Sequence, residues 1–135
     1  TNMNQQIIQR ALRVLFLFYW LSLTVGLVHP RGGDLTGFAG PILGEYSEFQ
    51  HFLAFVALAI VAVLARFSVT PSTLKVALLS YAILAEAVQA IVPGRALSLT
   101  DGMANVLGVL AALGIMSIVK PSSVGYAGNK PDFES

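Results

Sequence analysis

The chain has 135 residues, of which 56% are hydrophobic and only 11% are charged, and its formal net charge is +1. About a quarter of the residues in an ordinary soluble domain are charged, so this composition argues against a soluble protein and favours one whose surface contacts lipid. The small net charge gives no basis for nucleic-acid binding. The chain contains no cysteine, which excludes disulfides and thiolate metal sites, and its length predicts one domain.

The first predicted membrane span covers about residues 8–28. Residues 14–28 are almost wholly apolar, and the mixed segment before them is typical of a helix that starts at a membrane interface. Two arginines precede the apolar stretch, as in a signal peptide. The stretch is longer than the usual 7–15 residues of such a peptide, and no small-x-small cleavage site follows it, so we expect a retained membrane helix.

The second predicted span covers about residues 47–66. We expect residues 35–46 to form a loop, because they combine several glycines with Pro41. The pattern Ser47-x-x-Gln50 is that of a capping box, which predicts the start of a helix. Residues 52–65 are apolar without a break, and Arg66 marks the end of the span.

The third and fourth predicted spans cover about residues 74–92 and 101–119. Thr70 followed by Pro71 predicts an N-cap and a first helical residue. Pro93-Gly94 ends the third helix, and Thr100 or Asp101 opens the fourth. We therefore expect a membrane domain over residues 1–121 and a polar cytoplasmic tail over residues 122–135, which are rich in Gly, Ser and Pro.

The distribution of basic residues predicts the orientation of these four spans. With the N-terminus inside, the cytoplasmic face carries six basic residues: Arg10, Arg13, Arg66, Lys75, Lys120 and Lys130. The outer face carries only Arg31 and Arg95. Positive charge concentrates on the cytoplasmic side of membrane proteins. The sequence thus predicts an all-α integral membrane bundle of four transmembrane helices with both termini cytoplasmic.

Several polar residues lie close to or inside the apolar spans and are expected to meet at the outer end of the bundle. Glu86 and Gln89 are three residues apart, and Asp101 and Asn105 are four apart, so each pair shares one helix face. A carboxylate inside a membrane span is costly and should face the bundle interior with a partner. The predicted cluster comprises His51, Glu86, Gln89, Arg95, Asp101 and Asn105. Small residues such as Gly108 allow close helix packing on the same face.

Each member of this cluster also has a purely structural interpretation. Arg95 and Asp101 could form an ion pair that fixes the turn, and Asp101 could be simply an N-cap. Asn105 and Gln89 could hydrogen-bond between helices, and His51 could be structural. Glu86 is the residue for which a functional role is favoured, because a buried acid is expensive and readily replaced.

The sequence contains no strong catalytic or metal-binding pattern. It lacks H-x-x-x-H and E-x-x-H spacings, a phosphate loop and a dinucleotide fingerprint, so we expect no metal and no cofactor. Two acids and one histidine could support general acid–base chemistry, but this combination is unspecific. The catalytic residues, if there are any, are not identified by the sequence.

The segment 86–108 resembles the VanZ-like family of small bacterial membrane proteins. The family pattern E-x-x-Q-x-x-x-P-x-R-x(5)-D-x-x-x-N-x-x-G is matched at Glu86, Gln89, Pro93, Arg95, Asp101, Asn105 and Gly108, while Gly94 lies within the turn. The family also carries an acid, a lysine and a histidine before this segment. Here His51 is kept, and Ser47-Glu48 replaces the acid–lysine pair. The resemblance covers roughly residues 47–116.

The resemblance implies a multi-pass protein of the bacterial cytoplasmic membrane, in a family whose founding member is associated with teicoplanin resistance. Three functions remain open. The first is an envelope protein that binds a lipid headgroup or a lipid-linked cell-wall precursor at the outward cluster. The second is an accessory subunit of a larger membrane complex. The third is an enzyme acting on a lipid intermediate, with Glu86 or Asp101 as base and His51 as its partner.

Overall fold

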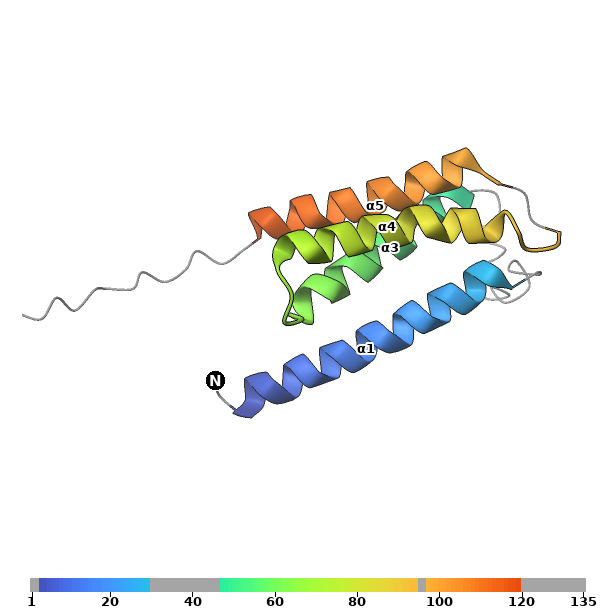
Figure 1. Cartoon of the computed structure of the whole chain (residues 1–135). Coiled ribbons are helices and arrows are strands. Elements are labelled where there is room, and N and C mark those ends of the chain that lie inside the picture. The colour runs from blue at the N-terminus through green and yellow to red at the C-terminus, as the bar shows by residue number, and fades with distance from the viewer. Residues whose placement is uncertain (1–2, 30–46, 95–96, 120–135) are drawn as a thin grey trace, which may run out of the picture.

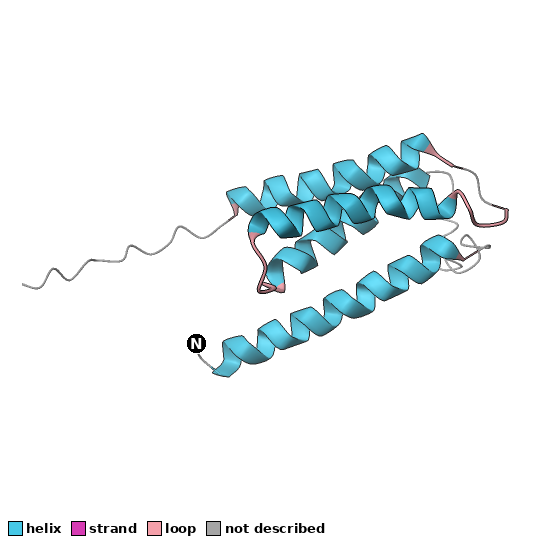
Figure 2. Cartoon of the chain, in the orientation of Figure 1, coloured by secondary structure: helices cyan, strands magenta, loops and turns pink. Residues whose placement is uncertain are grey.

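The computed structural model describes residues 3–29, 47–94 and 97–119, and within them every regular element is a helix. The four helices, in chain order, are α1 (Met3–Val28), α3 (Ser47–Leu64), α4 (Pro71–Gln89) and α5 (Leu99–Ile118) (Figures 1 and 2). Each is long and apolar enough to cross a membrane. The predicted all-α architecture with four candidate transmembrane helices is therefore confirmed for the described residues.

The cap residues explain where the last two helices begin. Thr70 is the N-cap of α4, where its side-chain oxygen accepts the Thr73 N–H at 3.1 Å, and Pro71 is the first helical residue. Ser98 caps α5 in the same way by accepting the Asp101 N–H at 3.2 Å. The prediction that Thr100 or Asp101 opens this helix is therefore wrong. The helix begins at Leu99, because Ser98 is the residue whose hydroxyl accepts the free N–H of the first turn.

The centre of the bundle is the contact between α3 and α5. These helices run parallel, and their paired residues differ by 54 in sequence number, as Ser47 and Asp101 do. In the same register, Phe55 and Val109 are fully buried. The contact is closest at Gly108, where a Cβ atom would lie only 2.5 Å from the carbonyl oxygen of Phe52. This glycine lets the two backbones approach closely.

Helix α1 is set off from the other three helices (Figure 1). Side chains along α1 hydrogen-bond to backbone atoms of α3 and of the turn that follows it. Arg13 donates from Nη2 to the Arg66 carbonyl oxygen at 2.8 Å and from Nε to the Ala65 carbonyl oxygen at 3.2 Å. The Tyr19 hydroxyl donates to the Ala54 carbonyl oxygen at 3.0 Å. Of the α1 residues described, only Leu27 is buried, so most of this helix faces outward.

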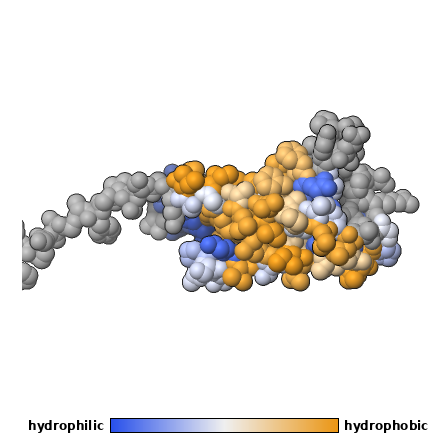
Figure 3. Space-filling model, turned by 90° about the horizontal axis from the view of Figure 1, so that it is seen from above, coloured by the Kyte–Doolittle hydropathy of each residue, from blue (hydrophilic) through white to orange (hydrophobic). Residues whose placement is uncertain are grey.

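The two ends of the bundle differ from its middle. Hydrophobic side chains cover the middle of the face shown in Figure 3, and hydrophilic residues lie toward both ends. The N-terminal ends of α3 and α5 and the C-terminal ends of α1 and α4 lie together at one end (Figure 1). All the described members of the predicted polar cluster belong to the helix segments at this end, which we call the cluster end.

Candidate functional site

Two polar pairs join α3 to α5 at the cluster end. The Ser47 hydroxyl lies 3.2 Å from both carboxylate oxygens of Asp101 and donates to them. One helical turn deeper, His51 Nδ1 lies 2.9 Å from Asn105 Oδ1. His51 Nε2 lies 3.8 Å from Asp101 Oδ2, which links the two pairs. His51 and Asp101 are each 14% exposed, so this network is largely shielded.

The contacts of Asn105 determine the tautomer of His51. Asn105 is fully buried, and its Nδ2 lies 3.4 Å from the Ala82 carbonyl oxygen, to which it donates. Its Oδ1 therefore faces the histidine as an acceptor, so His51 Nδ1 carries the hydrogen. Nε2 is then the ring nitrogen that lies toward Asp101, 3.8 Å from Oδ2.

Glu86 lies on α4 and connects it to the start of α5. Its Oε1 accepts the backbone N–H of Ser98 at 2.6 Å, and Ser98 is the N-cap of α5. In a capping box, a side chain within the same helix satisfies this N–H. Here the preceding helix supplies the acceptor, and the negative charge lies where the dipole of α5 favours it. One oxygen of Glu86 therefore has a clear structural role.

The other oxygen of Glu86 has no such role. Glu86 is 5% exposed, and its Oε2 is buried with no hydrogen-bond partner among the described residues. Gln89, three residues later and 3% exposed, has a buried Nε2 that also lacks a partner within this part of the chain. A buried polar group without a partner typically costs about 1–3 kcal/mol. Within the described residues, two such atoms therefore lie on one helix face without a partner.

An apolar groove of about 480 Å³ runs beside Glu86 between α4 and α5. Among the described residues that line it, Glu86 is the one charged residue, and leucine and methionine side chains of α5 and its lead-in supply much of the remaining wall. Gly102 opens the groove next to the acid, because a Cβ atom there would lie 3.4 Å from Glu86 Cγ. We call this cavity the Glu86 groove. It combines an apolar channel with a buried carboxylate.

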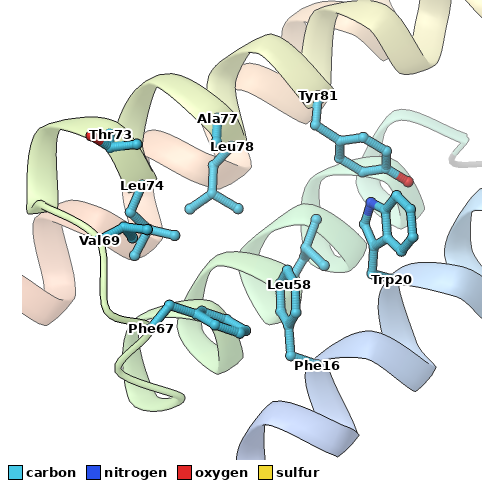
Figure 4. Close-up of a pocket in the computed structure, with 10 residues that line it drawn as sticks. All are labelled: Phe16, Trp20, Leu58, Phe67, Val69, Thr73, Leu74, Ala77, Leu78 and Tyr81. Carbon is cyan, nitrogen blue, oxygen red and sulfur yellow. The ribbon is translucent and has the colours of Figure 1, made fainter.

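A second groove, of about 300 Å³, lies between α1, α3 and α4 (Figure 4). Aromatic side chains from three parts of the chain point into it, among them Phe16, Trp20 and Tyr81. Its hydroxyl groups are already engaged: Tyr81 shares a 2.8 Å hydrogen bond with Thr24, and Thr73 shares one with Thr70. Trp20 also lines this groove, and its indole N–H can only donate.

The structure brings five of the six predicted cluster residues to the cluster end: His51, Glu86, Gln89, Asp101 and Asn105. They form two groups. One joins His51, Asp101 and Asn105, and the other contains Glu86 and Gln89; Ser98 contacts both Glu86 and Asp101. Asp101 is not the N-cap, which is Ser98. Arg95, with the ion pair suggested for it, lies outside the described residues, as do residues 30–46 and the tail over residues 122–135.

The turn residues Pro93 and Gly94 lie between α4 and α5, and Gly94 has a positive φ of 84° that suits glycine. Helix α4 ends at Gln89, three residues before the predicted end. Glu86 is therefore one turn from the end of its helix, closer to the turn than the sequence suggested.

Two contributors to the site were missed by sequence reasoning. Ser47 was predicted only as a helix start, and its hydroxyl also contacts Asp101 on another helix. Ser98 was not singled out. The spacing Ser98-x-x-Asp101 carried a signal, because a serine three residues before an acid is common at helix starts.

The described contacts of the network are hydrogen bonds and one 3.8 Å approach of His51 to Asp101. Among the described residues, no group of three His, Cys, Asp or Glu side chains is arranged to hold a metal ion. Ser47 contacts Asp101 rather than His51, so the order of contacts is serine–acid–histidine. A nucleophilic triad requires the histidine to contact the serine, so the described contacts do not form one.

No family model, curated protein or solved structure matches the chain.

Proposed function

We propose that this chain is a VanZ-like multi-pass protein of the bacterial cytoplasmic membrane that binds the headgroup of a lipid, or of a lipid-linked cell-wall precursor, at the cluster end. The observation that carries this proposal is a pair of buried atoms, Glu86 Oε2 and Gln89 Nε2, that have no hydrogen-bond partner among the described residues. Glu86 also lines the Glu86 groove. A headgroup supplies the missing partners, and the apolar groove accepts part of its chain. A link to teicoplanin resistance is supported only by the resemblance in residues 86–108.

Binding is tested with the purified protein in detergent micelles. Thermal unfolding is followed while either bacterial phospholipid or a lipid-linked cell-wall precursor is added. A ligand that binds only the folded state raises the melting temperature. We expect this rise in the wild type and its loss in Glu86→Ala. Glu48→Gln is the matched control, because Glu48 is an exposed acid at the start of α3, outside the cluster. Equal shifts in the wild type and both variants would contradict the proposal.

The proposed orientation places the cluster end outside the cell. The chain has no cysteine, so single cysteines introduced at exposed sites report the two ends independently. Ala90 lies at the cluster end, and Ser68 lies in the α3–α4 turn at the opposite end. We expect Ala90→Cys to react with an impermeant maleimide on intact cells, and Ser68→Cys to react only after permeabilisation. The reverse result would place the cluster in the cytoplasm.

An accessory-subunit role is the second candidate, and the outward face of α1 favours it. This helix buries only Leu27 among its described residues, while Leu17, Phe18 and Leu21 are all more than half exposed. A neighbouring membrane subunit would cover these side chains, as lipid chains do in the first candidate. Purification under native conditions distinguishes the two, since an accessory subunit is recovered with a partner in fixed proportion.

A further inference from the structure

The two buried atoms at the cluster end that lack a partner among the described residues have opposite hydrogen-bonding character. Glu86 Oε2 is a carboxylate oxygen and accepts, whereas Gln89 Nε2 is an amide nitrogen and donates. Both residues belong to the last turn of α4, and their spacing of three places them on one helix face. A ligand group that serves both atoms must therefore both donate and accept.

A hydroxyl is the smallest lipid group with both capacities. An ammonium group only donates, and a phosphate ester or ether oxygen only accepts, so either would leave one of the two protein atoms unsatisfied. We propose that Glu86 and Gln89 recognise a hydroxyl group carried on a hydrocarbon chain, and that the Glu86 groove holds the chain. The hydroxyl can belong to a long-chain alcohol or to the sugar of a glycolipid, which share this chemistry.

The groove suits the chain for reasons of size and lining. Its volume of about 480 Å³ lies within the roughly 300–1,000 Å³ of small-molecule sites. Leu99, Met103 and Leu107 supply apolar wall, and Gly102 keeps the space next to the acid open. Glu86 Oε2 itself is covered. Ligand entry therefore requires the Glu86 carboxylate to turn toward the groove that this residue already lines.

No preference for a hydroxyl group is expected at the second groove, between α1, α3 and α4. Its hydroxyl groups from Thr73 and Tyr81 are hydrogen-bonded within the protein. The Trp20 indole N–H that lines this groove only donates, so it would bind a hydroxyl oxygen and an ether oxygen alike and give a hydroxyl no advantage over an ether. Preference for a hydroxyl is therefore specific to the Glu86 groove.

This inference rests on the proposed function and narrows its ligand. The test is native mass spectrometry of the full chain released from detergent micelles, with three probes added separately: hexadecan-1-ol, hexadecyl β-glucoside and hexadecyl methyl ether. The ether matches the alcohol in its chain but cannot donate to Glu86. We expect at least one hydroxyl probe to bind on the order of tenfold more tightly than the ether, because the ether leaves a buried carboxylate oxygen unpaired. The probe that binds identifies the source of the hydroxyl.

Glu86→Gln tests the acceptor directly. Glutamine retains an oxygen for the Ser98 N–H and replaces the second oxygen with an amide nitrogen, which donates. The variant should therefore bind the hydroxyl probe and the ether with similar affinity. Circular dichroism of the variant in micelles establishes that it keeps its helices.

A second pair of variants tests the position of the chain without touching the polar atoms. Leu107 lines the Glu86 groove and is 53% exposed, whereas Leu110, on the same helix, is 47% exposed and does not line it. Tryptophan at either position projects from the surface, so neither change disturbs the core. We expect Leu107→Trp to weaken binding of the hydroxyl probe at least fivefold and Leu110→Trp to leave it unchanged.

The outcomes separate this inference from the proposed function. Equal binding of hydroxyl and ether probes by the wild type, or equal effects of the two tryptophans, overturns the hydroxyl-and-groove proposal. In that case a lipid-dependent melting shift that Glu86→Ala abolishes would still support headgroup binding. If neither the probes nor the lipids bind in a Glu86-dependent manner, both proposals fail.

Discussion

Replacing Gly108 with alanine tests whether the α3–α5 contact holds the site together. The new Cβ atom would lie 2.5 Å from the Phe52 carbonyl oxygen, about 0.9 Å closer than the 3.4 Å at which ordinary van der Waals contact begins. It would also lie 3.2 Å from Phe55 Cβ and from the Val56 nitrogen. A backbone carbonyl within a helix cannot turn aside as a side-chain end can. The two helices must therefore separate, and an added methyl group in a packed core costs about 1–3 kcal/mol.

Gly114→Ala is the matched control for this prediction. Gly114 lies on the same helix, and a Cβ atom there has no neighbour within 4 Å. Alanine is favoured over glycine in a helix interior by about 1 kcal/mol, so this control should be slightly more stable than the wild type. The two alanine variants should therefore differ by about 2–4 kcal/mol in their free energies of unfolding.

The assay is unfolding in mixed micelles with increasing dodecyl sulfate, followed by far-ultraviolet circular dichroism. The Gly108→Ala variant should unfold at a lower dodecyl sulfate fraction than the wild type, and Gly114→Ala at an equal or higher one. Separation of α3 from α5 also lengthens the contact between His51 and Asn105, so the histidine ring resonances should shift in Gly108→Ala alone. Equal stability of the two variants would refute the close packing inferred at Gly108.

Two further predictions concern the attachment of α1. Thr24→Val and Tyr81→Phe each remove the 2.8 Å hydrogen bond between α1 and α4. Each should lower the free energy of unfolding by about 0.5–1.5 kcal/mol. The double variant should lose less free energy than the two single variants together, and strict additivity would contradict the shared bond. Arg13→Met keeps much of the apolar stem but removes the bonds to the Ala65 and Arg66 carbonyl oxygens. Because these bonds are partly exposed, it should destabilise by only about 1–2 kcal/mol, measured by the same titration; an unchanged midpoint would show that they do not hold α1.

The helices were predictable because their causes are local. Each helix could be recognised from residues that are neighbours in the sequence. These signals are the unbroken apolar stretches, the pair Thr70-Pro71 and the turns that contain glycine and proline. The start of α5 was misplaced by two residues because Ser98 competes with Thr100 and Asp101 as a cap, and only the backbone conformation at Ser98 decides between them. The end of α4 was misplaced because apolar residues continue to Val92, while the backbone hydrogen bonds change from the i→i−4 to the i→i−3 pattern at Ile91 and Val92.

The location of five of the six cluster residues at one end of the bundle was predictable, whereas their pairing was not. Spacings of three and four placed Glu86 with Gln89 and Asp101 with Asn105 on shared faces. The 54-residue register that places His51 against Asn105 depends on how α3 packs against α5, and no local pattern encodes that. The same applies to Glu86. The free-energy cost of a carboxylate inside a membrane span was evident from the sequence. The hydrogen bond from the Ser98 N–H to Glu86 was not, because it arises from the tertiary fold.

The most direct test of the central claim is a distance measurement in a bilayer. Solid-state nuclear magnetic resonance can detect magnetisation transfer between the ¹³C-labelled carbinol carbon of hexadecan-1-ol and the labelled side chains of the protein. The account predicts transfer to Glu86 Cδ and to the Gln89 side-chain amide, and loss of the Glu86 contact in Leu107→Trp. Transfer confined to the groove around Phe16 and Trp20, or none at saturating alcohol, would contradict it.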